Sequence, residues 1–125
     1  MFLIVSSNFG YNKDIRKDEM KDKSELFLRY WFYTGHSIAP RPEYKFLPDR
    51  KFRFDWAFPE SCVGVEVDGG VWLPHGGRHG TDKDREKMNL AAANGWLVFR
   101  FSPQMLENDP VGCCELVEKG MAWND

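Results

Sequence analysis

The chain has few cysteines, and they lack the spacing of a disulfide framework. Cys62, Cys113 and Cys114 make an odd number, two of them are adjacent, and no Cys-x-x-Cys pair occurs. This pattern argues against a disulfide framework and favours a reducing cytosol. A zinc site built from these cysteines and the three histidines also has no supporting spacing.

Long apolar runs and an excess of positive charge are missing as well. No segment approaches the roughly 20 apolar residues that a transmembrane helix needs. The opening Met-Phe-Leu-Ile-Val lacks the basic start and the length of a signal peptide. The formal net charge of −2 excludes a globally basic nucleic-acid binder. We therefore expect a soluble cytoplasmic protein with no membrane partner.

Aromatic residues, in contrast, are abundant and make up 15% of the 125 residues. A chain of this length can bury a substantial core but is too short for two domains. We expect one domain over residues 1–125, with its core at about 22–106 and a C-terminal helix at about 110–121.

Periodicity and capping residues predict the order helix, strand, strand, helix, strand, helix. Thr81 can cap the second helix and Asn94-Gly95 can end it. Helices are expected at about 22–34, 81–94 and 110–121, and strands at about 51–58, 62–68 and 96–101. The proline-rich segment 40–48 predicts a loop or an irregular edge strand. A β-hairpin followed by a helical crossover indicates an α/β fold, a mixed β-sheet flanked by α-helices.

Three carboxylates are expected on one face of the two central strands. Alternation places Asp55 opposite the aromatic residues of 51–58, and Glu66 and Asp68 opposite the valines of 62–68. Converging acids form sites for hard divalent cations, and without a cation their mutual repulsion is unfavourable. Such an ion can activate water against a phosphodiester. The alternative is a set of acids on an exposed surface.

Further groups could complete this site. The carbonyl of Val67 could add an oxygen ligand between Glu66 and Asp68, and Asp68 could bind an ion or orient a partner. Glu25 begins the first helix, which could carry its carboxylate to the site if it packs behind the hairpin. The alternative for Glu25 is an acid favoured by the helix dipole.

Three cationic or titratable residues are candidates for phosphate or proton chemistry. Arg78 and His79 in the glycine-rich loop 69–80 suit phosphate contact, and His79 could also transfer protons. Lys87 could direct its charge at an attacking water or a transition-state oxygen. The alternatives are a surface histidine and a solvated helix lysine. Arg100, inside an apolar strand, needs a partner if it is buried.

A basic strip precedes the first strand. Its five basic residues and two acidic residues give segment 41–53 a net charge of +3. Such clusters attract phosphate backbones in a salt-dependent way, although a solvated loop is the alternative. The basic residues are Arg41, Lys45, Arg50, Lys51 and Arg53.

These motifs resemble the PD-(D/E)XK nuclease superfamily, over roughly residues 24–106. The nearest branch is that of very-short-patch-repair-like endonucleases and related small phage or prophage proteins. Asp followed by Glu-x-Lys is a loose motif, and the strings Gly-Gly-x-Trp, Gly-Arg-His and Asp-x-Glu-Lys-x-Asn make the likeness more specific. The matching segments are Arg53-Phe54-Asp55-Trp56-Ala57, Val65-Glu66-Val67-Asp68-Gly69-Gly70, Asp84 to Lys87, Gly95-Trp96 and Val98-Phe99-Arg100-Phe101.

The resemblance implies a restriction-endonuclease-like core and Mg²⁺-dependent cleavage of DNA, with Mn²⁺ as a substitute, in phage recombination or repair. Asp55 and Glu66 would bind the metal, and Glu25 would be an accessory acid. The usual lysine two residues after the glutamate is Asp68 here. The positive charge is therefore expected from Lys87 first and from His79 second. The implied location is the cytoplasm of a bacterial or phage-infected cell.

Two alternatives stay open within this resemblance. One is a resolvase of Holliday junctions or other branched DNA, which a homodimer would favour because two symmetric cuts need two sites. The other is a catalytically inactive DNA-binding module that keeps the nuclease fold. Asp68 in place of lysine is the reason to consider the second alternative.

Overall fold

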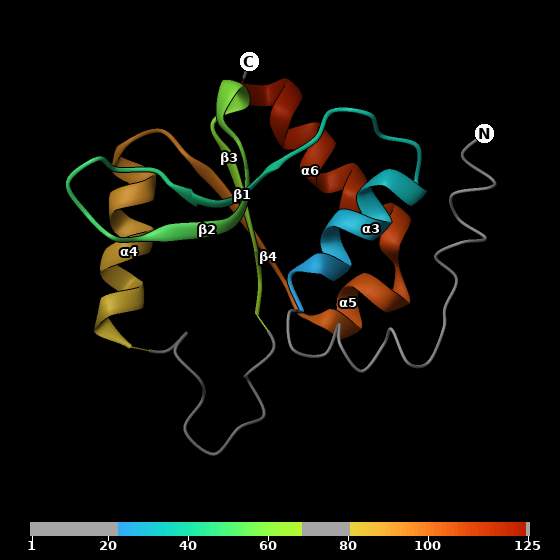
Figure 1. Ribbon diagram of the computed structural model, residues 1–125, viewed down its shortest axis with the longest axis horizontal. Coiled ribbons are helices and arrows are strands. Elements are labelled where there is room, and N and C mark those ends of the chain that lie inside the picture. Colours follow the sequence, from blue (N-terminus) through green and yellow to red (C-terminus); the bar gives the residue numbers. More distant parts are fainter. Residues whose placement is uncertain (1–22, 69–80, 125) are drawn as a thin grey trace.

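The computed structural model describes residues 23–68 and 81–124 (Figure 1). None of its helices in these ranges is both long and apolar enough to cross a membrane. The helices are α3 (Glu25–Tyr33), α4 (Asp82–Ala93), α5 (Pro103–Asn108) and α6 (Pro110–Asn124), with a short 3-10 helix at Pro59–Ser61. The strands are β1 (Arg41–Lys45), β2 (Arg53–Phe58), β3 (Val63–Val67) and β4 (Leu97–Phe101).

The four strands form one mixed sheet in the order β1-β2-β3-β4. β1 and β3 both pair with β2 in antiparallel orientation, and β4 pairs with β3 in parallel. The predicted hairpin and helical crossover are confirmed, since α4 connects the parallel strands β3 and β4. β1 is an edge strand, a position that tolerates its Pro42.

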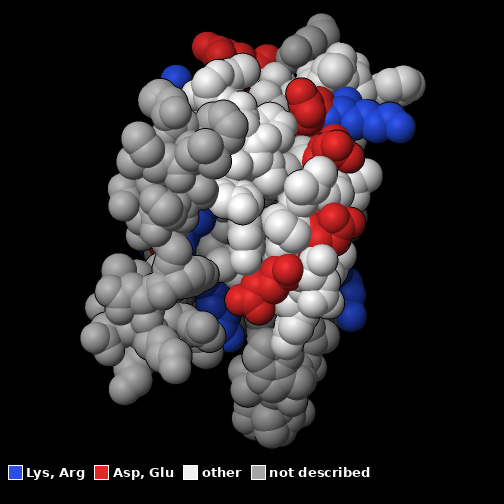
Figure 2. All heavy atoms as spheres, turned by 90° about the vertical axis from the view of Figure 1, so that its right-hand side faces the viewer, with Lys and Arg blue, Asp and Glu red and all other residues white. Residues whose placement is uncertain are grey.

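Helices cover both faces of the sheet (Figure 1). α3, α5 and α6 pack on one face around a core that includes Phe27, Trp31 and Leu106, and α4 lies on the other. Figure 2 looks onto the three-helix side, where carboxylates lie beside a largely uncharged surface. Glu115 and Glu118 of α6 are exposed.

The alternation predicted for 51–58 is wrong in the first half of the segment. Trp56 and Phe58 pack in the three-helix core, but Phe54 packs with Ala57 and Ala91 on the α4 face, and Phe52 packs against the same cluster. Gly64 provides the room, because a Cβ there would lie 2.6 Å from Cδ2 of Phe54. On β1, Glu43 has a φ of 49° at the point opposite this change of face. Backbone irregularity and a missing side chain together move Phe54 to the α4 side.

Local capping signals account for the helix boundaries. The Thr81 hydroxyl accepts a hydrogen bond from the Asp84 amide at 3.1 Å, which confirms the predicted cap of α4. Gly95 follows α4 with a φ of 82°, which suits glycine. The short α5 was not predicted, although Ser102 caps it and Pro103 opens it. α6 begins at the predicted Pro110 and runs to Asn124, beyond the expected end near Met121.

Candidate active site

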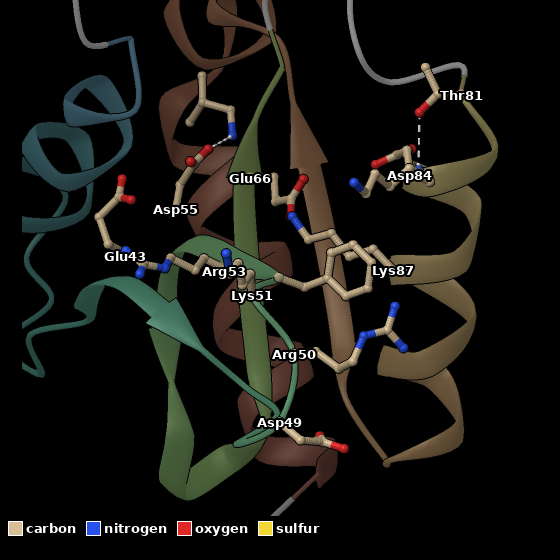
Figure 3. A pocket seen from close by; sticks show the side chains of 13 residues that line it. Glu43, Asp49, Arg50, Lys51, Arg53, Asp55, Glu66, Thr81, Asp84 and Lys87 are labelled. Carbon is tan, nitrogen blue, oxygen red and sulfur yellow. Dashed lines mark hydrogen bonds and ion pairs between the residues drawn. The ribbon is translucent and has the colours of Figure 1, made fainter.

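A pocket of about 950 Å³ opens between the central strands and α4 (Figure 3). It combines acids on β2 and β3 with cations from the β1–β2 connection and from α4. Its lining residues are Glu43, Asp49, Arg50, Lys51, Phe52, Arg53, Asp55, Glu66, Val67, Thr81, Lys83, Asp84 and Lys87.

Asp55 and Glu66 come together through the register of the hairpin. Trp56 pairs with Val65 across the antiparallel strands, so Asp55 and Glu66 occupy the next position on β2 and β3. Both line the pocket. Asp55 is half-buried, whereas Glu66 is only 3% exposed. The structure thus places the two acids predicted to bind a metal in the same pocket.

A backbone hydrogen bond orients Asp55. The Val67 amide donates to Oδ2 of Asp55 at 2.8 Å. Burial raises the pKa of Asp55 above its ordinary value, the Val67 hydrogen bond opposes this, and the negative charge of Glu66 adds to the rise. The charge of Lys87 lowers this pKa, but the net shift is upward. Burial and a neighbouring acid thus disfavour the ionised form of Asp55, and a cation would favour it.

Glu66 is in direct contact with Lys87. The Lys87 ammonium reaches from α4 to Oε2 of Glu66 (Figure 3), and the two side chains are 15% and 4% exposed. The same ammonium lies 5.6 Å from the ring centre of Phe54, within range of a cation–π interaction. The lysine considered first in the sequence therefore contacts the buried glutamate from the helix that follows β3.

Arg100 and Asp84 form a second ion pair beside Glu66. Nη2 of Arg100 lies 2.8 Å from both Oδ1 and Oδ2 of Asp84, and 3.9 Å from Oε1 of Glu66. Burial lowers the pKa of Arg100, but hydrogen bonding and the charges of Asp84 and Glu66 outweigh this and raise it. The sequence indicated that Arg100, inside an apolar strand, would need a partner. It did not identify Asp84 as that partner.

Two acids considered in the sequence do not line the pocket. Glu25 is exposed at the start of α3, on the three-helix side of the sheet. Asp68 follows β3, and its amide donates to the carbonyl of Phe101 at 2.8 Å. The charge of Asp68 contributes to the raised pKa of Arg100. Val67 lines the pocket and its amide donates to Asp55, and its carbonyl as a metal ligand stays a prediction.

The basic strip is divided between the pocket and the sheet edge. Arg50, Lys51 and Arg53 line the pocket, and Arg50 pairs with Glu86 of α4 at 2.5 Å. Arg41 and Lys45 are exposed on β1 and do not line it. Lys83 of α4 adds a cation that the sequence reasoning missed. Arg78 and His79 lie outside the described residues.

The acid pair fits a magnesium ion that keeps part of its water shell. Within residues 23–68 and 81–124, no three Asp, Glu, His or Cys side chains are grouped to hold a metal. Mg²⁺ is commonly held by only one or two carboxylates, with waters and substrate phosphates as the remaining ligands. Asp55 and Glu66, two acids close enough to influence each other's charge, meet that requirement.

Sequence and structure comparisons found no relative from which a function could be transferred. No protein-family model, curated protein or solved structure matches the chain.

Proposed function

We propose that this protein is a Mg²⁺-dependent DNA endonuclease that hydrolyses phosphodiester bonds. The observation that supports this most directly is that Asp55, Glu66 and Lys87 line one pocket together with exposed basic residues. The mixed sheet with helices on both faces agrees with the restriction-endonuclease-like core that the sequence resemblance implies.

The proposed chemistry divides between two acids on the sheet and one cation on α4. Asp55 and Glu66 hold the metal, which when bound supplies an activated water and stabilises charge on the phosphate. The Val67 amide keeps the Asp55 carboxylate oriented toward this task. Lys87 places a positive charge beside Glu66, where it can stabilise the negative charge that develops on a phosphate oxygen.

The rim of the pocket would bind the DNA backbone. Lys51, Arg53 and Lys83 are exposed, line the pocket and come from both of its sides. Cations in such a position bind phosphates without reading sequence, and their contribution falls as salt rises. A local set of cations accounts for DNA binding by a chain whose net charge is −2.

Lys87 also bears on the alternative of an inactive DNA-binding module. That alternative rested on Asp68 in place of the usual lysine. Because an ammonium from α4 contacts Glu66, the pocket has a positive charge without a lysine at position 68. This observation supports an active enzyme over an inactive module.

The test is cleavage of labelled DNAs by the wild-type protein and three variants. Linear duplex, single strand, mismatch, flap and four-way junction are incubated with Mg²⁺, Mn²⁺ or EDTA. Asp55→Asn and Glu66→Gln should abolish metal-dependent cleavage while DNA binding, measured by fluorescence anisotropy, remains. Glu60→Gln is the matched control, since Glu60 is an exposed acid in the β2–β3 turn outside the pocket.

Each outcome of this panel has a definite meaning. Metal-dependent cutting lost in both variants supports the site, and the substrate cut fastest separates mismatch-type nicking from resolution of branched DNA. Cutting that survives both substitutions refutes the assignment of Asp55 and Glu66. Salt-sensitive binding with no cutting of any DNA supports the inactive module instead.

A further inference from the structure

We propose that Arg100, through its paired hydrogen bonds to Asp84, is the positioning residue that sets Lys87 of α4 against Glu66. The inference rests on the proposed function and extends it to an ion pair beside the reacting groups. Neither Arg100 nor Asp84 is assigned contact with the metal or the DNA.

The guanidinium of Arg100 links three elements. The parallel register pairs Arg100 of β4 with Glu66 of β3, so the two side chains start from neighbouring strands. Nη2 of Arg100 then meets both oxygens of Asp84 at 2.8 Å and approaches Oε1 of Glu66 at 3.9 Å. One cation therefore sits between the buried acid of β3 and the first turn of α4.

Apolar packing alone holds the first half of α4 weakly. Within α4, Ala91 in the third turn is the one buried residue. The partly buried Leu90 packs beside it in the α4-side cluster. The first turns instead meet the sheet through Asp84 and Lys87, whose side chains are 11% and 15% exposed. The placement of the N-terminal half of α4 thus depends on ion pairs.

Asp84 and Lys87 lie on one side of the helix. Residues three apart are neighbours on a helical surface, so fixing Asp84 also fixes the turn that presents Lys87. The Thr81 hydroxyl binds the Asp84 amide at 3.1 Å and fixes the start of the same turn. Arg100 consequently determines the distance between the Lys87 ammonium and Glu66 through its hydrogen bonds to Asp84.

The geometry calls for arginine in particular. A guanidinium is planar and rigid, so it holds Nη2 at a fixed position, from which this one nitrogen reaches both oxygens of Asp84. Lysine keeps the charge but is a point donor on a flexible stem. Arg100→Lys therefore separates the two explanations, because a purely electrostatic role would survive this change and a positioning role would not.

The first test measures the position of α4 without using activity. Amide hydrogen exchange is followed by mass spectrometry in the full chain and in Arg100→Gln, Arg100→Lys and Asp84→Asn. We expect exchange in the first turns of α4 to rise about tenfold or more in all three, because each disrupts the hydrogen bonds from Nη2 of Arg100 to both oxygens of Asp84. Exchange in α6 should stay at the wild-type rate. Asp82→Asn is the matched control, as it breaks the exposed Asp82–Arg85 pair of the same helix.

The second test asks whether Arg100 acts through Lys87. Cleavage rates are measured for Arg100→Gln, Lys87→Met and the double variant at saturating Mg²⁺. Arg100→Gln should lose about 10²-fold, the scale expected for a misplaced catalytic group. In the Lys87→Met background the same change should cost less than about threefold, because the group that it positions is already absent. Arg100→Lys should not restore the rate.

Several results would overturn the positioning role. Unchanged exchange in α4, full activity of Arg100→Lys, or losses that multiply in the double variant would each do so. If Arg100→Gln fails to fold, Asp84→Asn keeps the arginine in place and tests the same pair. If the wild-type protein cuts no DNA, only the proposed function is refuted. The hydrogen-exchange experiment still tests whether Arg100 positions α4, because it does not depend on activity.

Discussion

The ammonium of Lys87 contacts Oε2 of Glu66, joining α4 to the most buried acid of the sheet. This contact gives the pocket a positive charge that does not come from the strand bearing the acid. It also means that a metal bound by Glu66 would share that carboxylate with a lysine.

Replacing Lys87 should separate catalysis from metal binding. We expect Lys87→Met to lower kcat by about 10²- to 10³-fold, the effect of removing one group that stabilises transition-state charge. Binding of Mn²⁺, measured by calorimetry, should be unchanged or tighter, because Glu66 loses a competing cation. Arg85→Met removes a positive charge from the exposed side of the same helix and should keep wild-type kcat. Loss of Mn²⁺ binding in Lys87→Met would contradict this role.

The raised pKa of Asp55 predicts the acid limb of activity. The metal requires the ionised carboxylate, and burial of Asp55 followed by the charge of Glu66 moves its pKa upward. The fall of kcat/KM with decreasing pH should therefore begin above the ordinary aspartate value of about 3.9. A pH–rate profile at a fixed, subsaturating metal concentration measures this limb, because bound metal favours the ionised carboxylate. An acid limb at the ordinary aspartate value would show that Asp55 ionises normally.

The same pKa predicts how stability depends on pH without metal. The folded protein binds the Asp55 proton more tightly than the unfolded chain, so the contribution of this group to stability falls as pH rises through its raised pKa. In EDTA, Asp55→Asn should therefore unfold at a higher urea concentration than the wild type at pH 7. At about pH 2.5, more than one unit below the ordinary aspartate pKa of about 3.9, aspartate is protonated in both states and the difference should disappear. A lower midpoint for Asp55→Asn at pH 7 would contradict the upward shift.

Cations at the rim should control the salt dependence of DNA binding. Lys51→Gln removes one exposed cation of the pocket, and the slope of log K against log salt should become shallower by about 0.9 if it meets one phosphate of duplex DNA. Lys45→Gln is the matched control, because Lys45 is exposed on β1 outside the pocket. Anisotropy titrations at several salt concentrations measure both slopes. Equal changes in both variants would indicate binding along the whole basic strip.

Gly64 should be intolerant of a side chain. Its Cβ would lie 2.6 Å from the Phe54 ring, so Gly64→Ala should lower the free energy of unfolding by about 1–3 kcal/mol. Urea denaturation of the single variants and of Gly64→Ala with Phe54→Leu measures the coupling. Leucine at position 54 relieves the overlap, so the double variant should lose less free energy of unfolding than the sum of the two single variants. This outcome would confirm that the two residues compete for space. Strictly additive losses would contradict it.

Local signals in the sequence were sufficient for most of the fold. Thr81, Asn94-Gly95 and Pro110 mark helix boundaries through hydrogen bonds and backbone angles that depend on near neighbours, and the mixed sheet follows from the order of elements. Ser102 and Pro103 carried the same kind of signal for α5 and were overlooked.

Features that depend on tertiary packing were harder to predict. The side taken by Phe54 depends on the empty space at Gly64, which alternation along β2 does not reveal. The resemblance led us to expect Glu25 near the acid pair, but α3 leaves it exposed on the other side of the sheet. The hydrogen bonds between Arg100 and Asp84 could not be predicted, because they form only when α4 packs against β4.

Because the pocket lysine lies on a helix, the proposed site is sensitive to insertions and deletions in α4. A residue inserted between Asp84 and Lys87 would turn the lysine by about 100° around the helix axis. It would then point away from Glu66, although strand pairing stays intact. Position 68, which does not line the pocket, is released from that constraint. The rotational phase of α4 is thus as much a part of the proposed site as the register of the sheet.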